Sequence, residues 1–131
     1  MTIWNLQKAI YETLSNDTNI ANIVTGVYDF VPDNTLYPYI TMQLDEISNW
    51  DIISQDGFEV ILKIDIFCKD NANKSCLQIF DLVHAALHDA IILLDGNYNL
   101  QNIQFVTARM PKKNVNDIYR ITSSFVAKIS Y

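Results

Sequence analysis

Apolar residues recur along the chain with two different periods, and each period predicts a different kind of element. Near the N-terminus, Ile3, Leu6, Ile10 and Leu14 follow one another at spacings of three and four, which is the period of an amphipathic helix. The "SND" segment at residues 15–17 supplies side chains that end this helix or cap a short second turn. The chain is therefore expected to begin with a helix.

Further along, the apolar residues alternate with polar ones, which is the period of a β-strand. The alternation runs through residues 39–45 and again, more strongly, through residues 58–66, with a polar loop between them. Residues 100–110 and 118–131 form another such pair around the turn "PKKNVND". These segments predict two long hairpins.

A helix of about five turns is predicted between the hairpins, where the spacing of apolar residues returns to three and four. Its apolar stripe consists of Cys76, Ile79, Val83, Leu87 and Ala90. Before the first hairpin, the segment "VYDFV" at residues 27–31 predicts a short edge strand that stops at Pro32, because proline cannot donate to a strand ladder.

Together these elements predict an α+β fold. We expect an antiparallel sheet of two long hairpins, with the N-terminal helix and one long central helix packed on one face. A length of 131 residues is typical of one domain with a modest core. Residues 1–131 are therefore expected to form a single domain.

Composition narrows the classes of function. The net charge is −6, whereas tight binding to a nucleic-acid backbone or to an anionic membrane needs clustered positive charge. No apolar run approaches the roughly 20 residues that span a bilayer, and the N-terminus does not resemble a signal peptide. Cys68 and Cys76 are accordingly expected to be buried free thiols of a protein made in the cytoplasm.

Two histidines raise the possibility of a metal site. His84 and His88, in "HAALH", stand four positions apart on the predicted helix, so both imidazoles lie on one face. No third ligand is evident, and the residue after the first histidine is Ala85 where a zinc protease has Glu. Ordinary helix residues and a small metal-dependent enzyme are the two alternatives, and we expect no enzyme and no cofactor.

Charge is distributed unevenly between the two hairpins. Five acids and no Lys or Arg lie between Asp45 and Glu59, whereas four of the nine basic residues lie between Arg109 and Arg120. Either these are two solvated loops, or the acidic loop of one copy contacts the basic tip of the next in a head-to-tail manner. Trp50, an aromatic residue in a polar loop, would anchor such a contact.

The segment before the first long strand is marked by proline and aromatic residues. The run 26–42 reads "GVYDFVPDNTLYPYITM", and it resembles the signature of the phage tail-completion family. The family pattern also includes a Leu-x-x-Ala helix and a Ser-x-Asp turn. In this sequence the matching residues are Leu6, Ala9, Ser15, Asp17, Val27, Tyr28, Asp29, Pro32, Tyr37, Pro38 and Tyr39.

The resemblance implies a virion structural protein of a long-tailed phage, made in the host bacterial cytoplasm. It would form a ring, a hexamer, that caps the tail tube, stops its growth and presents a docking face to a head-completion or connector protein. DNA would pass through the lumen without specific binding, and another connector or adaptor role is the alternative. Candidate interface residues are Tyr37, Pro38, Tyr39, Trp50, Asp51, Asp56, Arg109, Lys112, Lys113 and Arg120.

Overall fold

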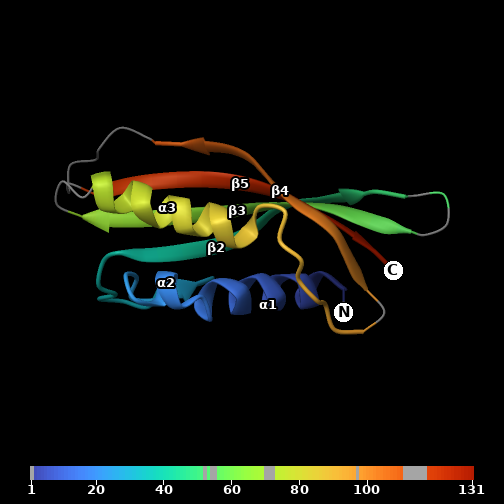
Figure 1. The fold of residues 1–131 in the computed structure, drawn as a ribbon, viewed down its shortest axis with the longest axis horizontal. Helices are drawn as coiled ribbons and strands as arrows, with labels where there is room; N and C mark the ends of the chain where they lie inside the picture. The colour runs from blue at the N-terminus through green and yellow to red at the C-terminus, as the bar shows by residue number, and fades with distance from the viewer. Residues whose placement is uncertain (1, 52, 54–55, 70–72, 97, 111–117) are drawn as a thin grey trace.

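The computed structural model of the protein describes residues 2–51, 53, 56–69, 73–96, 98–110 and 118–131. Two helices, three strands, a further helix and two further strands follow one another along the described part of the chain and form an α+β fold (Figure 1). In chain order they are α1 (Thr2–Ser15), α2 (Thr18–Ala21), β1 (Val27–Tyr28), β2 (Tyr39–Asn49), β3 (Gly57–Lys69), α3 (Asn73–Leu87), β4 (Asn99–Arg109) and β5 (Ile118–Ser130). The described strands form one sheet in the order β1-β2-β3-β5-β4.

Both predicted pairs of long strands are present, because β2 pairs with β3 and β4 pairs with β5, each in antiparallel fashion. The two pairs join through β3 and β5, which run antiparallel from Gly57 opposite Ser130 to Lys69 opposite Ile118. This central pair spans thirteen residues on each strand, or about 40 Å at the usual rise of a strand. The sheet is therefore long and narrow.

The expectation of a purely antiparallel sheet is wrong, because β1 pairs with β2 in parallel. Val27 lies opposite Ile40, and the backbone N–H of Ile40 donates to the Gly26 carbonyl at 3.1 Å. A tight hairpin would have reversed the chain, but the connection at residues 29–38 contains Pro32 and Pro38. It makes a longer crossing that returns the chain in the same direction.

The central helix is shorter than predicted. α3 has 15 residues and ends at Leu87, and α1 is nearly as long with 14 residues. Asp89 adopts a left-handed conformation with φ of 55°, and its N–H donates to the Ile103 carbonyl of β4 at 2.8 Å. The chain thus leaves the helix toward the sheet before Ala90. The short turn expected after "SND" is α2, with Asp17 as its N-cap.

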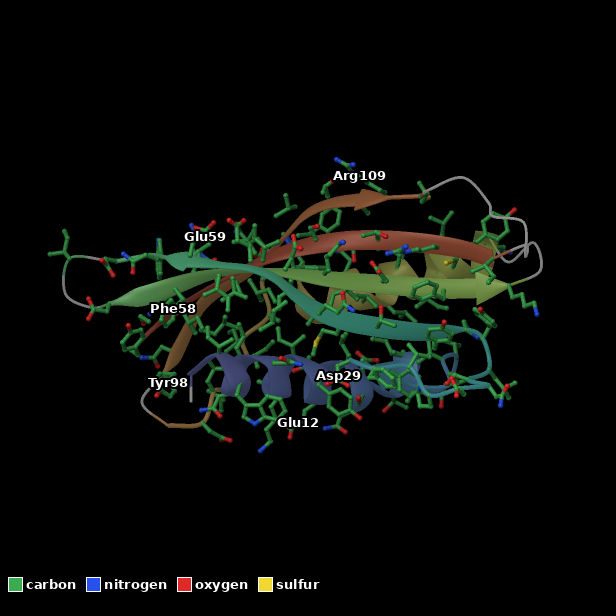
Figure 2. The ribbon with its side chains drawn as sticks, turned by 180° about the vertical axis from the view of Figure 1, so that it is seen from behind. Glu12, Asp29, Phe58, Glu59, Tyr98 and Arg109 are labelled. Carbon is green, nitrogen blue, oxygen red and sulfur yellow. The ribbon has the colours of Figure 1, made fainter. Side chains whose placement is uncertain are left out.

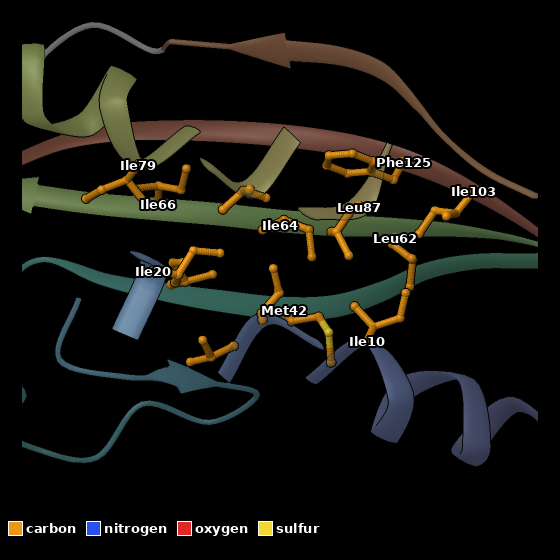
Figure 3. Close-up of a cluster of buried hydrophobic side chains, with 14 of the residues drawn as sticks. Ile10, Ile20, Met42, Leu62, Ile64, Ile66, Ile79, Leu87, Ile103 and Phe125 are labelled. Carbon is orange, nitrogen blue, oxygen red and sulfur yellow. The ribbon is translucent and has the colours of Figure 1, made fainter. Parts of the chain in front are cut away.

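A single apolar core lies between the helices and one face of the sheet (Figure 3). On β3 the alternate residues Val60, Leu62, Ile64 and Ile66 are all fully buried, as the period of two predicts. They meet the buried stripes of both long helices and the inward side chains of β2, β4 and β5. These partners include Leu6, Ile10, Leu14, Ile79, Val83, Leu87, Met42, Ile103 and Phe125.

The opposite face of the sheet is not covered by any of the described helices (Figure 2). The ends of β2 and β3 near the turn between them extend past the helices (Figure 1). A bulge between Leu44 and Glu46 shifts the register there. Beyond the bulge, residues 45–49 of β2 are exposed. β2 thus continues into part of the segment that was expected to be a loop.

Candidate assembly surface

An aromatic row crosses three strands on the open face of the sheet. Tyr39 of β2 lies opposite Phe67 of β3, which in turn lies opposite Arg120 of β5. The rings of Tyr39 and Phe67 stack with centroids 5.0 Å apart, and the Arg120 guanidinium lies 5.4 Å from the Phe67 centroid. Tyr37 adds a third ring, 5.1 Å from Tyr39. The register of the sheet therefore brings together three of the residues proposed from sequence.

Arg120 is fixed within this row by an ion pair. Its Nη2 donates to Oδ2 of Asp65 at 2.8 Å, and the two side chains are 44% and 11% exposed. None of the described residues donates to the other carboxylate oxygen of Asp65, Oδ1, which is buried. A charge-assisted contact of this kind holds the guanidinium plane against the Phe67 ring. One edge of Arg120 remains accessible to solvent.

The proline-marked segment before β2 is tied to the residues before β1. The Thr25 N–H donates to the Pro38 carbonyl at 2.8 Å, and the Thr25 hydroxyl donates to the Leu36 carbonyl at 2.7 Å. The Tyr37–Pro38 peptide bond is cis. Partial burial, together with the neighbouring Tyr37 hydroxyl, raises the pKa of Tyr39 above its ordinary value. Tyr37 and Tyr39 are thus half-buried and held in place.

Trp50 and the acidic residues beside it lie at the other end of the sheet. The Trp50 N–H donates to the Gly57 carbonyl at 2.9 Å, and the Tyr131 N–H donates to the Asp56 carbonyl at 3.0 Å. The ammonium of Lys128 lies 5.5 Å from the Trp50 ring. Trp50 is half-buried, whereas Asp51 and Asp56 are exposed. The indole therefore packs against its own chain and supports the base of the β2–β3 turn.

The acidic and basic residues proposed from sequence lie at opposite ends of the sheet. Gly57 pairs with Ser130 at the end of β5, whereas Phe67 pairs with Arg120 near its start. Ten residues of strand separate these pairs, which corresponds to about 33 Å. Arg109 is exposed and lies at the basic end, opposite Thr122. Lys112 and Lys113 lie outside the described residues.

A cavity of about 850 Å³ opens beside the aromatic row, and sequence reasoning did not find it. One wall is the segment before β2, and the other is formed by the end of β3 and the start of α3. Its described lining residues are Ile23, Asn34, Thr35, Leu36, Tyr37, Pro38, Cys68, Lys69, Ser75, Gln78 and Ile79. Leu36 lines the cavity and is 74% exposed. Its exposure could not be predicted from the sequence, because the segment before β2 has no periodic pattern of apolar residues.

His84 lies in the last turn of α3, whereas His88 lies just past the end of the helix at Leu87, so the prediction that both stand on the helix is wrong for His88. The two rings stack on each other instead of converging on a point. Their ring centroids are 4.8 Å apart and the rings are 20° from parallel. Nδ1 of His88 accepts the backbone N–H of Phe105 at 3.0 Å, and its Nε2 lies 3.3 Å from an Asp89 oxygen. No group of three metal-ligating side chains occurs among the described residues. The pair thus links α3 to β4.

The prediction of two buried free thiols is confirmed for Cys68 and Cys76. The Cys76 thiol lies 3.8 Å from the Ile66 carbonyl and donates to it. Its hydrogen-bonding contact with Cys68, together with burial, raises the pKa of Cys76 well above the ordinary range. A protonated, buried thiol is a poor nucleophile. Within the described part of the chain, the helices are too short or too polar to cross a membrane.

A known protein family matches nearly the whole chain. The family model described as Tail completion protein gp17 matches residues 8–130. The chain belongs to this family. The resemblance carried by the proline and aromatic run is therefore confirmed, and the family identifies the chain as a structural component of a phage-like tail.

A solved structure supports the fold of this family member. A chain of the "Virion of native gene transfer agent (GTA) particle" superimposes with a TM-score of 0.89 at 23% sequence identity. The match covers 99% of this chain and 98% of that chain. No curated protein matches the sequence.

Proposed function

We propose that the protein forms a hexameric ring that caps the tail tube, stops tube growth and provides the surface for head–tail joining. The observation that carries the proposal is the family match over residues 8–130. The ring would occupy the end of the tail that faces the head, in a particle assembled in the bacterial cytoplasm. Its role is structural, without catalysis and without a cofactor.

The distribution of charge supports a head-to-tail contact between copies. Asp51 and Asp56 lie at one end of the sheet, and Arg109 and Arg120 lie at the other. A contact between unlike ends is heterologous, and such contacts close into a ring when the rotation between subunits permits. Opposite charges at the two ends also favour this register over contacts between like ends.

The aromatic row is proposed as a second docking surface, facing the tail-tube protein or the head connector. Tyr37 and Tyr39 present partly exposed rings on a segment that hydrogen bonds hold in place. Large, rigid aromatic surfaces lose little conformational entropy on binding. Arg120 adds a charged edge to the same surface.

The net charge of −6 fits a channel through which DNA passes. A lumen lined mainly with positive charge would retain phosphates, because each neutralised phosphate adds to the affinity. An acidic subunit instead repels the backbone. We therefore propose that DNA traverses the ring without specific binding.

Light scattering after size exclusion, across a range of concentrations, tests the proposal directly. The expected species has six times the subunit mass of 15.0 kDa and appears as a ring in negative-stain images. If the protein remains a monomer, isolated tail tubes should be added, since the tube end can act as a template. A monomer that also fails to bind tube ends would refute the proposal.

Deletion of the gene in the parent particle separates termination from joining. Overlong tubes indicate that tube growth has lost its stop, as we propose. Tails of normal length beside filled heads would instead assign the protein to a connector or adaptor role.

A further inference from the structure

The cavity beside the aromatic row is open, and none of the described side chains fills it. Leu36 and Ile23 line it and are 74% and 40% exposed. Among the described lining residues, Lys69 is the only charged one. A concave, mainly apolar site with one cation, of a volume typical of ligand sites, is suited to an apolar side chain flanked by acids.

Such a segment lies at the far end of the sheet. Ile53, in the turn between β2 and β3, is fully exposed, and Asp51 and Asp56 flank it. No Lys or Arg occurs between residues 45 and 59. An exposed apolar side chain flanked by acids has the composition of an interface anchor.

The base of this turn is rigid. Trp50 and Gly57 are joined by a backbone hydrogen bond, and Tyr131 holds Asp56. Phe58 stacks on Tyr131 with ring centroids 5.4 Å apart. Because these contacts already order the base, docking the turn costs less conformational entropy than docking a free loop.

The turn cannot reach the cavity of its own chain. Gly57 and Lys69 lie at opposite ends of β3, twelve residues apart along a continuous strand, which corresponds to about 40 Å. Docking of this turn into this cavity therefore joins two copies of the chain. The contact is heterologous, so each copy both inserts a turn and accepts one.

We infer that the β2–β3 turn of one copy inserts Ile53 into the cavity of the next copy, where Asp51 and Asp56 face Lys69. The inference rests on the proposed ring, and it identifies the contact that joins neighbouring subunits. Leu36, Tyr37 and Pro38 form the apolar wall that receives Ile53. The proline-marked lead-in to β2 thereby acquires a role as part of a receptor.

Disulfide trapping tests this contact. The variant carrying Ile53→Cys and Leu36→Cys should form a ladder of covalent multimers under mild oxidation, and reducing agent should collapse it. The matched control carries Ile53→Cys and Ile91→Cys, because Ile91 is 95% exposed but does not line the cavity. Both variants also carry Cys68→Ala, because the free Cys68 thiol lines the cavity and could itself trap the introduced cysteine. Circular dichroism verifies that each variant is folded.

Charge exchange provides a second readout. Lys69→Glu and Asp56→Lys should each weaken self-association about tenfold, and the double variant should recover most of that loss, because the exchanged charges attract again. Rings without a Leu36-specific ladder, or without recovery in the double variant, would overturn the inference while leaving the proposed ring intact. Absence of assembly, even on tail tubes, would refute the proposed function and this inference together.

Discussion

Gly57 occupies a position where neighbouring backbones leave no room for a side chain. A Cβ atom there would lie 2.3 Å from the Trp50 carbonyl oxygen and 2.5 Å from that of Ile129. Ordinary contact begins at 3.4 Å, so Gly57→Ala requires shifts of about 1 Å on both sides. Both obstacles are backbone atoms, which cannot rotate away as the end of a side chain can.

The expected cost follows from two opposing effects. Overpacking a tight site costs typically about 1–3 kcal/mol, while alanine reduces the entropy of the unfolded chain and returns about 0.4–1 kcal/mol. The substitution should therefore destabilise the protein by about 1–2 kcal/mol. It should also loosen the hydrogen bond from Trp50 to Gly57, now 2.9 Å long.

Urea unfolding at equilibrium measures this loss, and Gly26→Ala is the matched control. A Cβ at Gly26 would meet the hydroxyl oxygen of Tyr28 at 2.6 Å and its Cζ at 2.7 Å, but these atoms belong to a side chain that can swing aside. The control should stay within about 0.5 kcal/mol of the parent. Equal losses in both variants, or an unchanged Gly57→Ala, would refute the argument that fixed backbone atoms set the cost.

Three further predictions concern the core, the aromatic row and the histidines. Leu62→Ala should lower the free energy of unfolding in urea by about 2–5 kcal/mol, because Leu62 is 0% exposed. Leu77→Ala, at a site that is 38% exposed, should lower it clearly less. Similar losses in the two variants would contradict the assigned core. Burial and the neighbouring Tyr37 raise the pKa of Tyr39 above its ordinary value of 10.0. As the pH rises past 10.0, the Tyr39 hydroxyl therefore loses its proton in the unfolded chain before it does so in the folded protein, and the free energy of unfolding falls. Tyr39→Phe should flatten this fall, and identical pH profiles of the urea midpoint in the parent and the variant would contradict the prediction. Because Nδ1 of His88 already accepts a hydrogen bond from Phe105, EDTA should leave the thermal midpoint unchanged, while stoichiometric zinc that disappears in His84→Ala would restore the metal-enzyme alternative.

The long helices and strands were predictable from the sequence because the spacing of apolar residues within each segment indicates its type. Leu6, Ile10 and Leu14 share one side of α1 whatever that helix packs against, and they are buried in the structure. The alternation of apolar and polar residues along β3 likewise predicts which of its side chains face the core. The parallel pairing of β1 was not predictable in this way. It depends on the path of the connecting residues 29–38, whose sequence has no regular spacing of apolar residues.

The helix end shows the same limit. Ala90 continues the apolar stripe of α3, so the pattern alone extends the helix by three residues. The chain instead turns at Asp89, where a backbone hydrogen bond to Ile103 of β4 competes with a further helical turn. Tertiary contacts of this kind override local pattern, and they are absent from any window of the sequence.

The candidate surface depends even more on strand order. Tyr37, Tyr39 and Arg120 were each proposed from sequence, but only the placement of β3 between β2 and β5 brings Arg120 beside Phe67 and Tyr39. Had the second hairpin met β3 through β4, Arg120 would lie one strand farther away and the row would be broken. The same strand order places the start of α3 against the segment before β2 and so forms the cavity. The residue types favour an interface, while the topology determines which of them act together.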